Sequence, residues 1–185
     1  MASLTQERIL LDSAGIDQAL DTMARDIVSS SGSVDRLAIV GIHTGGVHLA
    51  RRLCDRIASN EGNRPPEGMI DITLYRDDVF IGLPQPVVGR TEMPFDVSGI
   101  DIILVDDVLY TGRTVRSALD AIIDYGRPGR VRLAVLADRG LRELPVQADH
   151  VGLRIDTRRD QSVKVLLTEE GAEADEVVLY RKEEA

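Results

Sequence analysis

ILVDDVLYTGRT, residues 103–114, is the stretch that decides the fold of this sequence. The apolar run that ends in it, Ile102 to Val105, is typical of a strand buried on both faces, as in a parallel sheet. Two adjacent carboxylates and a short loop of hydroxyls and glycine follow, and then a predicted helix from Thr114 to Tyr125. A buried strand that passes through a short loop into a helix predicts half of a β-α-β unit.

The rest of the chain alternates in the same way. Apolar residues at helical spacing predict helices, and short continuous or alternating apolar runs predict strands. The predicted helices are Ile16–Val28 and Gly46–Ile57, and the predicted strands are Leu37–Ile42, Met69–Tyr75 and Val131–Ala137, with added edge strands at Val163–Leu167 and Val177–Tyr180. This alternation indicates an α/β fold, one domain over residues 1–185 with a central parallel sheet flanked by helices.

Composition excludes several classes of protein. Of the 185 residues, 43% are hydrophobic and 29% are charged, and no apolar run approaches the roughly 20 residues of a membrane helix. The first residues lack a basic and apolar secretory leader, so we expect a soluble cytoplasmic protein. The single cysteine, Cys54, excludes an intrachain disulfide and a cysteine-based zinc site. A formal net charge of −9 opposes non-specific nucleic-acid binding, so an RNA site would need a local arginine patch.

The loop Thr111–Thr114 has the features of a phosphate site. It opens a helix, where backbone N–H groups are free and the helix dipole is positive. Gly112 permits close approach, and the hydroxyls of Thr111 and Thr114 can donate hydrogen bonds. An ordinary capped helix start would share these features, and no G-x-x-x-x-G-K-S/T or G-x-G-x-x-G motif occurs. Ligands bind beyond the carboxyl ends of parallel strands. We therefore expect this loop and Gly41–Gly46 to lie together at one edge of the sheet and to form the mouth of a single binding site.

The acids narrow the kind of ligand. Asp106 and Asp107 are adjacent, so strand geometry turns them to opposite faces, and their charges repel unless polar groups or cations compensate. Vicinal ribose hydroxyls suit a carboxylate acceptor, and a divalent cation held mainly by pyrophosphate oxygens suits the charge. Acids beside a phosphate loop therefore favour a phosphorylated sugar over a bare phosphate.

Val105–Thr114, with its apolar strand, two acids and T-G-x-T loop, resembles the phosphoribosyl pyrophosphate (PRPP) motif of type I phosphoribosyltransferases. Four segments are similar, in the same order, to the PyrR family of pyrimidine operon attenuators and uracil phosphoribosyltransferases: Asp71–Asp78, Asp107–Arg116, Gly126–Pro128 and Ala137–Pro145. The similarity covers most of the chain, from about Ile16 to Asp149. It implies a type I phosphoribosyltransferase fold with a hood, to which residues 137–170 contribute, and a long lid loop. It also implies transfer of a phosphoribosyl group from PRPP to uracil, with Mg²⁺, giving UMP and pyrophosphate.

The resemblance assigns a role to each loop. Catalysis would fall to Asp106, Asp107 and Arg76, with the two aspartates meeting the ribose hydroxyls and, indirectly, a magnesium ion held mainly by PRPP. The substrate-binding residues would be the pyrophosphate loop Thr44, Gly45 and Gly46, then Val108, the 5-phosphate loop Thr111, Gly112, Arg113 and Thr114, and Asp138 and Arg139 of the hood. A homodimer or a higher assembly is implied too.

The segment 76–99 is about two dozen residues with no regular pattern, which is typical of a functional lid or a disordered insert. A lid fits the resemblance, because water would hydrolyse a reactive sugar cation unless it is excluded. Arg76 and Arg90 could follow the pyrophosphate during closure, or they could be solvated loop residues. His43, at the end of a strand, is expected to face the ligand, whereas His48 and His150 are expected to be structural or solvent-facing.

Two features depart from the family. Its pyrophosphate loop usually reads T-R-G, but here Gly45 replaces the arginine and removes a cation. The first helix carries Arg25 against three aspartates, which opposes RNA contact, while Arg154, Arg158 and Arg159 form a small basic cluster. We therefore favour the hypothesis that the protein is an enzyme. The alternative hypothesis is a nucleotide-responsive RNA-binding attenuator of little catalytic activity. Use of a purine or of orotate stays open, since Arg139 or Arg142 could pair with the orotate carboxylate.

Overall fold

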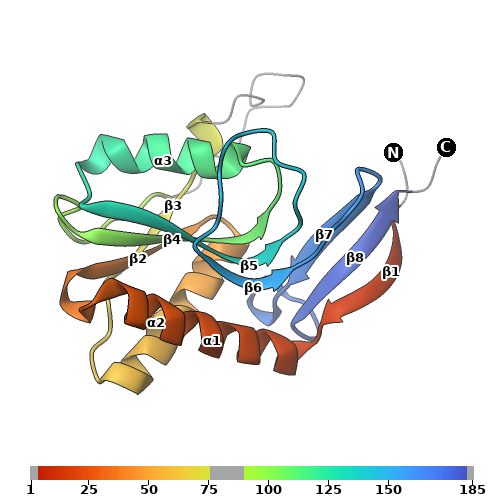
Figure 1. The fold of residues 1–185 in the computed structure, drawn as a ribbon, viewed down its shortest axis with the longest axis horizontal. Coiled ribbons are helices and arrows are strands. Elements are labelled where there is room, and N and C mark those ends of the chain that lie inside the picture. The colour runs from red at the N-terminus through yellow and green to blue at the C-terminus, as the bar shows by residue number, and fades with distance from the viewer. Residues whose placement is uncertain (1–3, 76–89, 183–185) are drawn as a thin grey trace.

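The computed structural model describes residues 4–75 and 90–182. At its centre lies a parallel sheet of five strands in the order β3-β2-β4-β5-β6 (Figure 1). The strands are β2 (Leu37–Ile42), β3 (Glu67–Ile70), β4 (Asp101–Leu109), β5 (Arg130–Asp138) and β6 (His150–Arg154). The predicted α/β fold with a central parallel sheet is confirmed.

Helices cover both faces of this sheet. On one face lie α1 (Ser13–Ser31) and α2 (Gly45–Glu61), and on the other lies α3 (Arg113–Tyr125) (Figure 1). Along β4, Ile103 packs in the core on the α1 and α2 side and Leu104 in the core on the α3 side. Both faces of the strand are buried from solvent, which explains why its sequence is a continuous apolar run.

Local sequence sets where the helices begin. The Oδ1 of Asp12 accepts a hydrogen bond from the Gly15 N–H at 2.8 Å, so Asp12 caps α1. Helix α3 begins after Gly112, whose φ of +92° is one that residues with a side chain rarely adopt. Among the described residues, no helix is both long enough and apolar enough to cross a membrane.

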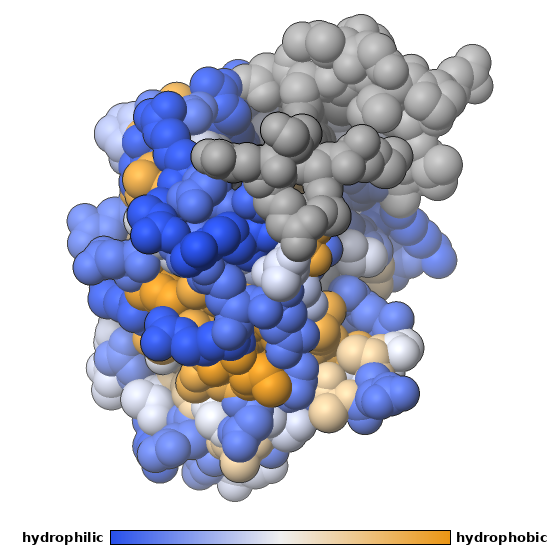
Figure 2. Space-filling view, turned by 90° about the vertical axis from the view of Figure 1, so that its right-hand side faces the viewer, coloured by the Kyte–Doolittle hydropathy of each residue, from blue (hydrophilic) through white to orange (hydrophobic). Residues whose placement is uncertain are grey.

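A second sheet was not predicted. Strands β1 (Leu4–Leu11), β8 (Glu176–Lys182) and β7 (Gln161–Leu166) form a separate antiparallel sheet in that order. Placing β7 and β8 at the edge of the parallel sheet was therefore wrong, because their hydrogen bonds go to each other and to β1. The parallel sheet ends instead in β6. The end of the molecule seen in Figure 2 carries hydrophobic patches among hydrophilic residues, and Ile9 of β1 is 45% exposed.

Two other boundaries differ from the prediction. Strand β3 ends at Ile70, and Thr73–Tyr75 is a 3-10 turn, because the Oδ1 of Asp71 accepts bonds from the N–H and hydroxyl of Thr73 at 2.7 and 2.5 Å. Strand β4 runs through both acids, because Val108 still pairs with Ala137 of β5.

Only part of the predicted lid can be compared with the structure. Residues 76–89, with Arg76, lie outside the described residues. The part that follows packs along β3, where Met69 and Glu92 exchange two backbone hydrogen bonds of 2.8 Å. Val97 is buried beneath α3 in the same core as Leu104.

Candidate functional site

A pocket of about 460 Å³ opens at the carboxyl ends of β2 and β4. Its walls come from four parts of the chain: the loop between β2 and α2, the end of β4 with the start of α3, the turn after β3, and the turn after β7. The lining residues are His43, Thr44, Gly45, Asp71, Ile72, Thr73, Asp106, Asp107, Val108, Thr114 and Glu170. The structure thus brings the two predicted loops together at one mouth, as the rule for parallel sheets predicts.

The loop after β2 is held tightly against β4 by glycine. A Cβ atom on Gly46 would lie 2.4 Å from the carbonyl oxygen of Val105, and one on Gly41 would lie 2.5 Å from the Cα of Val47. Thr44 caps α2, so the amides of Gly45 and Gly46 stand in the first helical turn, where N–H groups lack helical partners. Such a turn attracts anions. The peptide bond between His43 and Thr44 is cis.

The two acids differ in environment. Asp106 is 6% exposed and accepts a hydrogen bond from the Asp107 N–H at 3.0 Å. Burial, and then the charge of Asp107, raise the pKa of the Asp106 carboxyl well above its usual value. Asp107 is half-buried, and its Oδ1 accepts the N–H of Val108 at 2.7 Å. Asp107 is therefore the acid that is more accessible to a ligand, while burial of Asp106 favours its protonated form.

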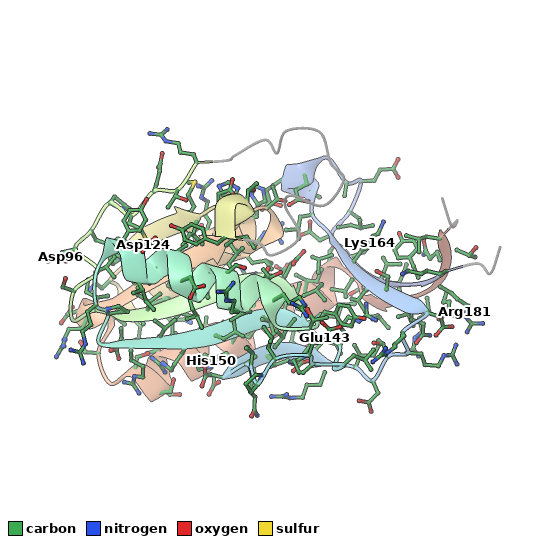
Figure 3. The ribbon with its side chains drawn as sticks, turned by 90° about the horizontal axis from the view of Figure 1, so that it is seen from above. Asp96, Asp124, Glu143, His150, Lys164 and Arg181 are labelled. Carbon is green, nitrogen blue, oxygen red and sulfur yellow. The ribbon has the colours of Figure 1, made fainter. Side chains whose placement is uncertain are left out.

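The predicted phosphate loop is braced from outside the pocket. The N–H groups of Glu143 and Leu144 both donate to the Thr111 carbonyl at 3.0 Å. Arg113 donates from Nε to Glu143 Oε2 at 2.9 Å, beside the start of α3 (Figure 3). Of the four loop residues, Thr114 lines the pocket.

Asp138 and Arg139, the predicted hood residues, are held by contacts within the protein. Asp138 is 8% exposed and accepts bonds from Arg142 Nη2 at 2.5 Å and from the Gly140 N–H at 3.1 Å. The guanidinium of Arg139 stacks on the ring of Tyr110 at 4.1 Å from its centre. Neither Asp138 nor Arg139 is among the described residues that line the pocket.

The charges of the pocket suit a cation carried by an anionic ligand. Asp71, Asp106, Asp107 and Glu170 line it, and no lysine or arginine does so among the described residues. A polyanion would need neutralisation to enter, and Mg²⁺ prefers such oxygen ligands. Within the described residues, no three acid or histidine side chains form a cage for a metal. The carboxylate oxygens that line the pocket therefore fit a magnesium ion brought in by an anionic ligand.

Sequence reasoning missed Glu170 as a wall of the pocket. Glu170 is the last residue of the 3-10 turn Thr168–Glu170 (η3). The residue before it, Glu169, accepts two hydrogen bonds from Arg52 of α2, 2.8 and 2.5 Å long. No local signal marks Glu170, because the fold brings it to the pocket from a distant part of the chain. Asp71 begins a segment that carries the family resemblance, but its sequence gives no sign that it faces the pocket.

The three histidines lie largely where the sequence suggested. His43 lines the pocket, and its Nε2 is 3.1 Å from the carbonyl oxygen of Arg90. The Nε2 of His48 is 4.0 Å from Glu170 Oε1. His150 is 3% exposed, with its Nδ1 2.6 Å from Asp26 Oδ2, so its position is structural.

Comparison with known proteins agrees with the geometry. The phosphoribosyl transferase domain family matches residues 8–167. The bifunctional protein PyrR of Deinococcus radiodurans is 51% identical over 86% of this chain and 87% of its own, and that of Syntrophobacter fumaroxidans is 49% identical over 96% and 95%. The hypoxanthine phosphoribosyltransferase of Trypanosoma cruzi superposes with a TM-score of 0.72 at 17% identity, over 96% of this chain and 98% of that one, which is a likeness of fold.

Proposed function

Because this chain belongs to the PyrR family of phosphoribosyl transferase domain proteins, we propose that it is a uracil phosphoribosyltransferase. It would convert uracil and PRPP, with Mg²⁺, to UMP and pyrophosphate. One observation carries the proposal: the anion-binding turn at Thr44 and Gly45, the acid Asp107 and the loop residue Thr114 line a single pocket.

Each part of the pocket would take a share of the proposed reaction. As pyrophosphate leaves the anomeric carbon, positive charge grows on the ribose ring, and a fixed carboxylate at Asp107 stabilises it. The first-turn amides of α2 receive the departing pyrophosphate. Mg²⁺, when bound with the donor, neutralises phosphate charge. The Thr114 hydroxyl and the amides that open α3 hold the 5-phosphate.

The hood favours uracil over orotate. A carboxylate on the base needs a free cation, and both candidate arginines are already bonded to the protein. Arg142 donates to the carbonyls of Tyr110 and Val146 at 2.9 and 3.0 Å as well as to Asp138. Arg139 donates to Thr157 Oγ1 at 3.1 Å and to the Gln161 carbonyl at 2.7 Å.

Several finer points stay predictions. Arg76 lies outside the described residues, so its catalytic role and the closure of a lid stay predictions. A homodimer, a single domain over residues 1–185 and a cytoplasmic location are expected from the family resemblance and the composition.

The test is UMP formation by the purified protein with uracil, PRPP and Mg²⁺. Asp107→Asn should lower kcat/KM roughly a hundredfold, because it removes charge that stabilises the transition state. Asp120→Asn is the matched control: this α3 carboxylate pairs with Arg116 at 2.8 Å and does not line the pocket. Absence of UMP, or equal activity in Asp107→Asn and wild type, would contradict the proposal. A panel of uracil, orotate and hypoxanthine, with uracil preferred, tests the base.

We propose as a second function that the protein is an RNA-binding regulator of pyrimidine genes, since its relatives are named bifunctional. Exposed arginines support it: the side chains of Arg154 and Arg158 are 63% and 62% exposed. Part of the acidity of α1 is neutralised, because Asp17 and Asp21 pair with Arg56 at 2.5 and 2.8 Å.

Titration of a pyrimidine leader transcript over a range of salt concentrations, with and without UMP, tests this second function. Arg154→Ala should weaken binding and reduce the slope of log affinity against log salt by about 0.7 if it contacts one phosphate of a single strand. Absence of RNA binding at low salt would contradict the regulatory function and would not affect the proposed enzymatic function.

A further inference from the structure

Arg139 is a buried cation that has no carboxylate partner among the residues that the structure describes. It directly follows β5 and is 5% exposed. Over residues 4–75 and 90–182 its guanidinium bonds only to oxygens of uncharged groups, a hydroxyl and two backbone carbonyls. Burial lowers its pKa. Buried arginines are nearly always paired with an acid, so an unpaired one points to a role that an apolar residue could not fill.

The contacts of Arg139 reach two different parts of the chain. The Cζ of its guanidinium lies over the Tyr110 ring, 4.1 Å from the ring centre. Its edge donates from Nε to Thr157 Oγ1 at 3.1 Å, and from Nη2 to the carbonyls of Arg158 and Gln161 at 3.2 and 2.7 Å. The Thr157 hydroxyl in turn donates to the Arg139 carbonyl at 2.9 Å.

These two parts belong to opposite sides of the proposed reaction. Tyr110 stands directly before Thr111, at the entrance to the phosphate loop, and the Arg139 N–H donates to the neighbouring Leu109 carbonyl at 3.1 Å. Residues 157–161 lead from β6 into β7 and lie within the predicted hood. Arg139 therefore touches both the phosphate side and the hood through one planar group.

We propose that Arg139 is a positioning residue that clamps residues 157–161 of the hood to Tyr110, and so fixes the hood over the base relative to the bound 5-phosphate. The inference rests on the proposed function and gives Arg139 a different role from a direct contact with the base. Its Nε and Nη2 are bonded to oxygens of residues 157–161, and these contacts together with the Tyr110 ring support the clamp. A lysine could not replace it, because it lacks both the planar face and the fork of donors.

The clamp is tested by a double-mutant cycle on Arg139→Lys and Tyr110→Leu. Each variant should raise the KM for uracil about tenfold, and the double variant should raise it about tenfold too, because both changes remove one shared contact. The dissociation constant of Mg²⁺-bound PRPP, measured by calorimetry, should stay within about twofold, because the phosphate loop itself is unchanged. Arg130→Lys is the control: it lies at the other end of β5, is 54% exposed and pairs with Asp101.

Two results would overturn the clamp. A double variant with the product of the single effects, about a hundredfold, would mean that Arg139 and Tyr110 act independently. An unchanged KM for uracil in Arg139→Lys would mean that the guanidinium is not needed. If Arg139→Lys does not fold, Thr157→Val removes the hydroxyl that Nε bonds, and it should raise the KM for uracil about threefold.

A measurement without turnover separates the clamp from the proposed function. Amide hydrogen exchange in residues 157–163 should be roughly tenfold faster in Arg139→Lys than in wild type, while exchange in the distant strand β2 stays the same. Equal exchange in the two proteins would contradict the clamp. Wild-type protein that makes no UMP would instead contradict the proposed reaction, and the exchange result would still decide the clamp.

Discussion

Gly45 lies against Asp107: a Cβ atom at position 45 would be 3.0 Å from Asp107 Oδ2 and 3.1 Å from its Cβ. Gly45→Ala should therefore push the carboxylate aside and lower kcat/KM for UMP formation about tenfold. The thermal midpoint should change little, because a side chain carboxylate at an open pocket can move. Wild-type activity in Gly45→Ala would contradict this expectation and show that the pocket accommodates a Cβ atom at position 45, as the T-R-G loop of the family implies.

Gly46→Ala gives the matched contrast. Its Cβ would lie 2.4 Å from the backbone oxygen of Val105, which cannot move without disturbing β4. We expect a loss of roughly 2 kcal/mol or more in the free energy of unfolding, measured by urea denaturation. Equal stability of Gly45→Ala and Gly46→Ala would contradict the close packing of this loop on β4.

The raised pKa of Asp106 makes stability depend on pH. A carboxyl whose folded pKa lies above its unfolded value stabilises the fold in its protonated form, and this contribution is lost as pH rises through the folded pKa. The free energy of unfolding of wild type should therefore fall relative to Asp106→Asn as pH rises above the ordinary value of 3.8. Urea denaturation over a pH series measures it. A difference that stays constant with pH would show that Asp106 does not carry a raised pKa.

Arg52 should matter most near neutral pH. Its Nη1 is 2.5 Å from Asp175 Oδ2, and hydrogen bonds from Arg52 lower the pKa of both Asp175 and Glu169. Acids with lowered folded pKa values stabilise the fold above their unfolded pKa, and the stability is lost as pH falls through the lowered values. Arg52→Met should cost roughly 1–2 kcal/mol at neutral pH, discounted for the partial exposure of Glu169.

Measurement of the free energy of unfolding at low pH checks this prediction. Below the ordinary values of 3.8 and 4.5 the difference between Arg52→Met and wild type should shrink. Arg51→Met is the control, because Arg51 is 56% exposed in its pair with Glu67 and should contribute about 0.5 kcal/mol or less. An effect of Arg52→Met that persists unchanged at low pH would point to lost packing rather than lost ion pairs.

The thiol of Cys54 should be inert in the folded protein. It is fully buried, and burial raises its pKa to about 12, so almost no thiolate is present at neutral pH. Reaction with a disulfide reagent should proceed only as fast as the protein unfolds, and at the ordinary rate in urea. Fast labelling of the native protein would contradict the packing of α2 against the sheet.

Much of the parallel sheet could be predicted because its signals are local. Leu37–Ile42 is continuously apolar and coincides with β2, and the α3 start follows from Gly112. The acid pair and the T-G-x-T loop likewise identified the mouth of the pocket. Periodicity and turn residues carry this information within a few positions.

What could not be predicted depends on distant partners. Nothing within Val163–Leu167 states that its strand pairs with β8, or that β8 pairs with Leu4–Leu11. Glu170 reaches the pocket through the same long-range arrangement, in a turn whose Glu169 is bonded by Arg52 of α2. The family resemblance assigns Arg139 to the hood over the base, whereas its bonds to residues 157–161 depend on the three-dimensional fold and could not be predicted from the sequence.

The pairing of β1 with β8 also orders events while the chain is being made. Leu4 pairs with Lys182, so β1 can find this strand partner only after β8 has been synthesised. Until then the parallel sheet can assemble but the antiparallel sheet cannot, and Arg52 and Glu169 have no fixed geometry. The antiparallel sheet, with the turn that carries Glu170 between β7 and β8, would therefore assemble only after β8 has been synthesised.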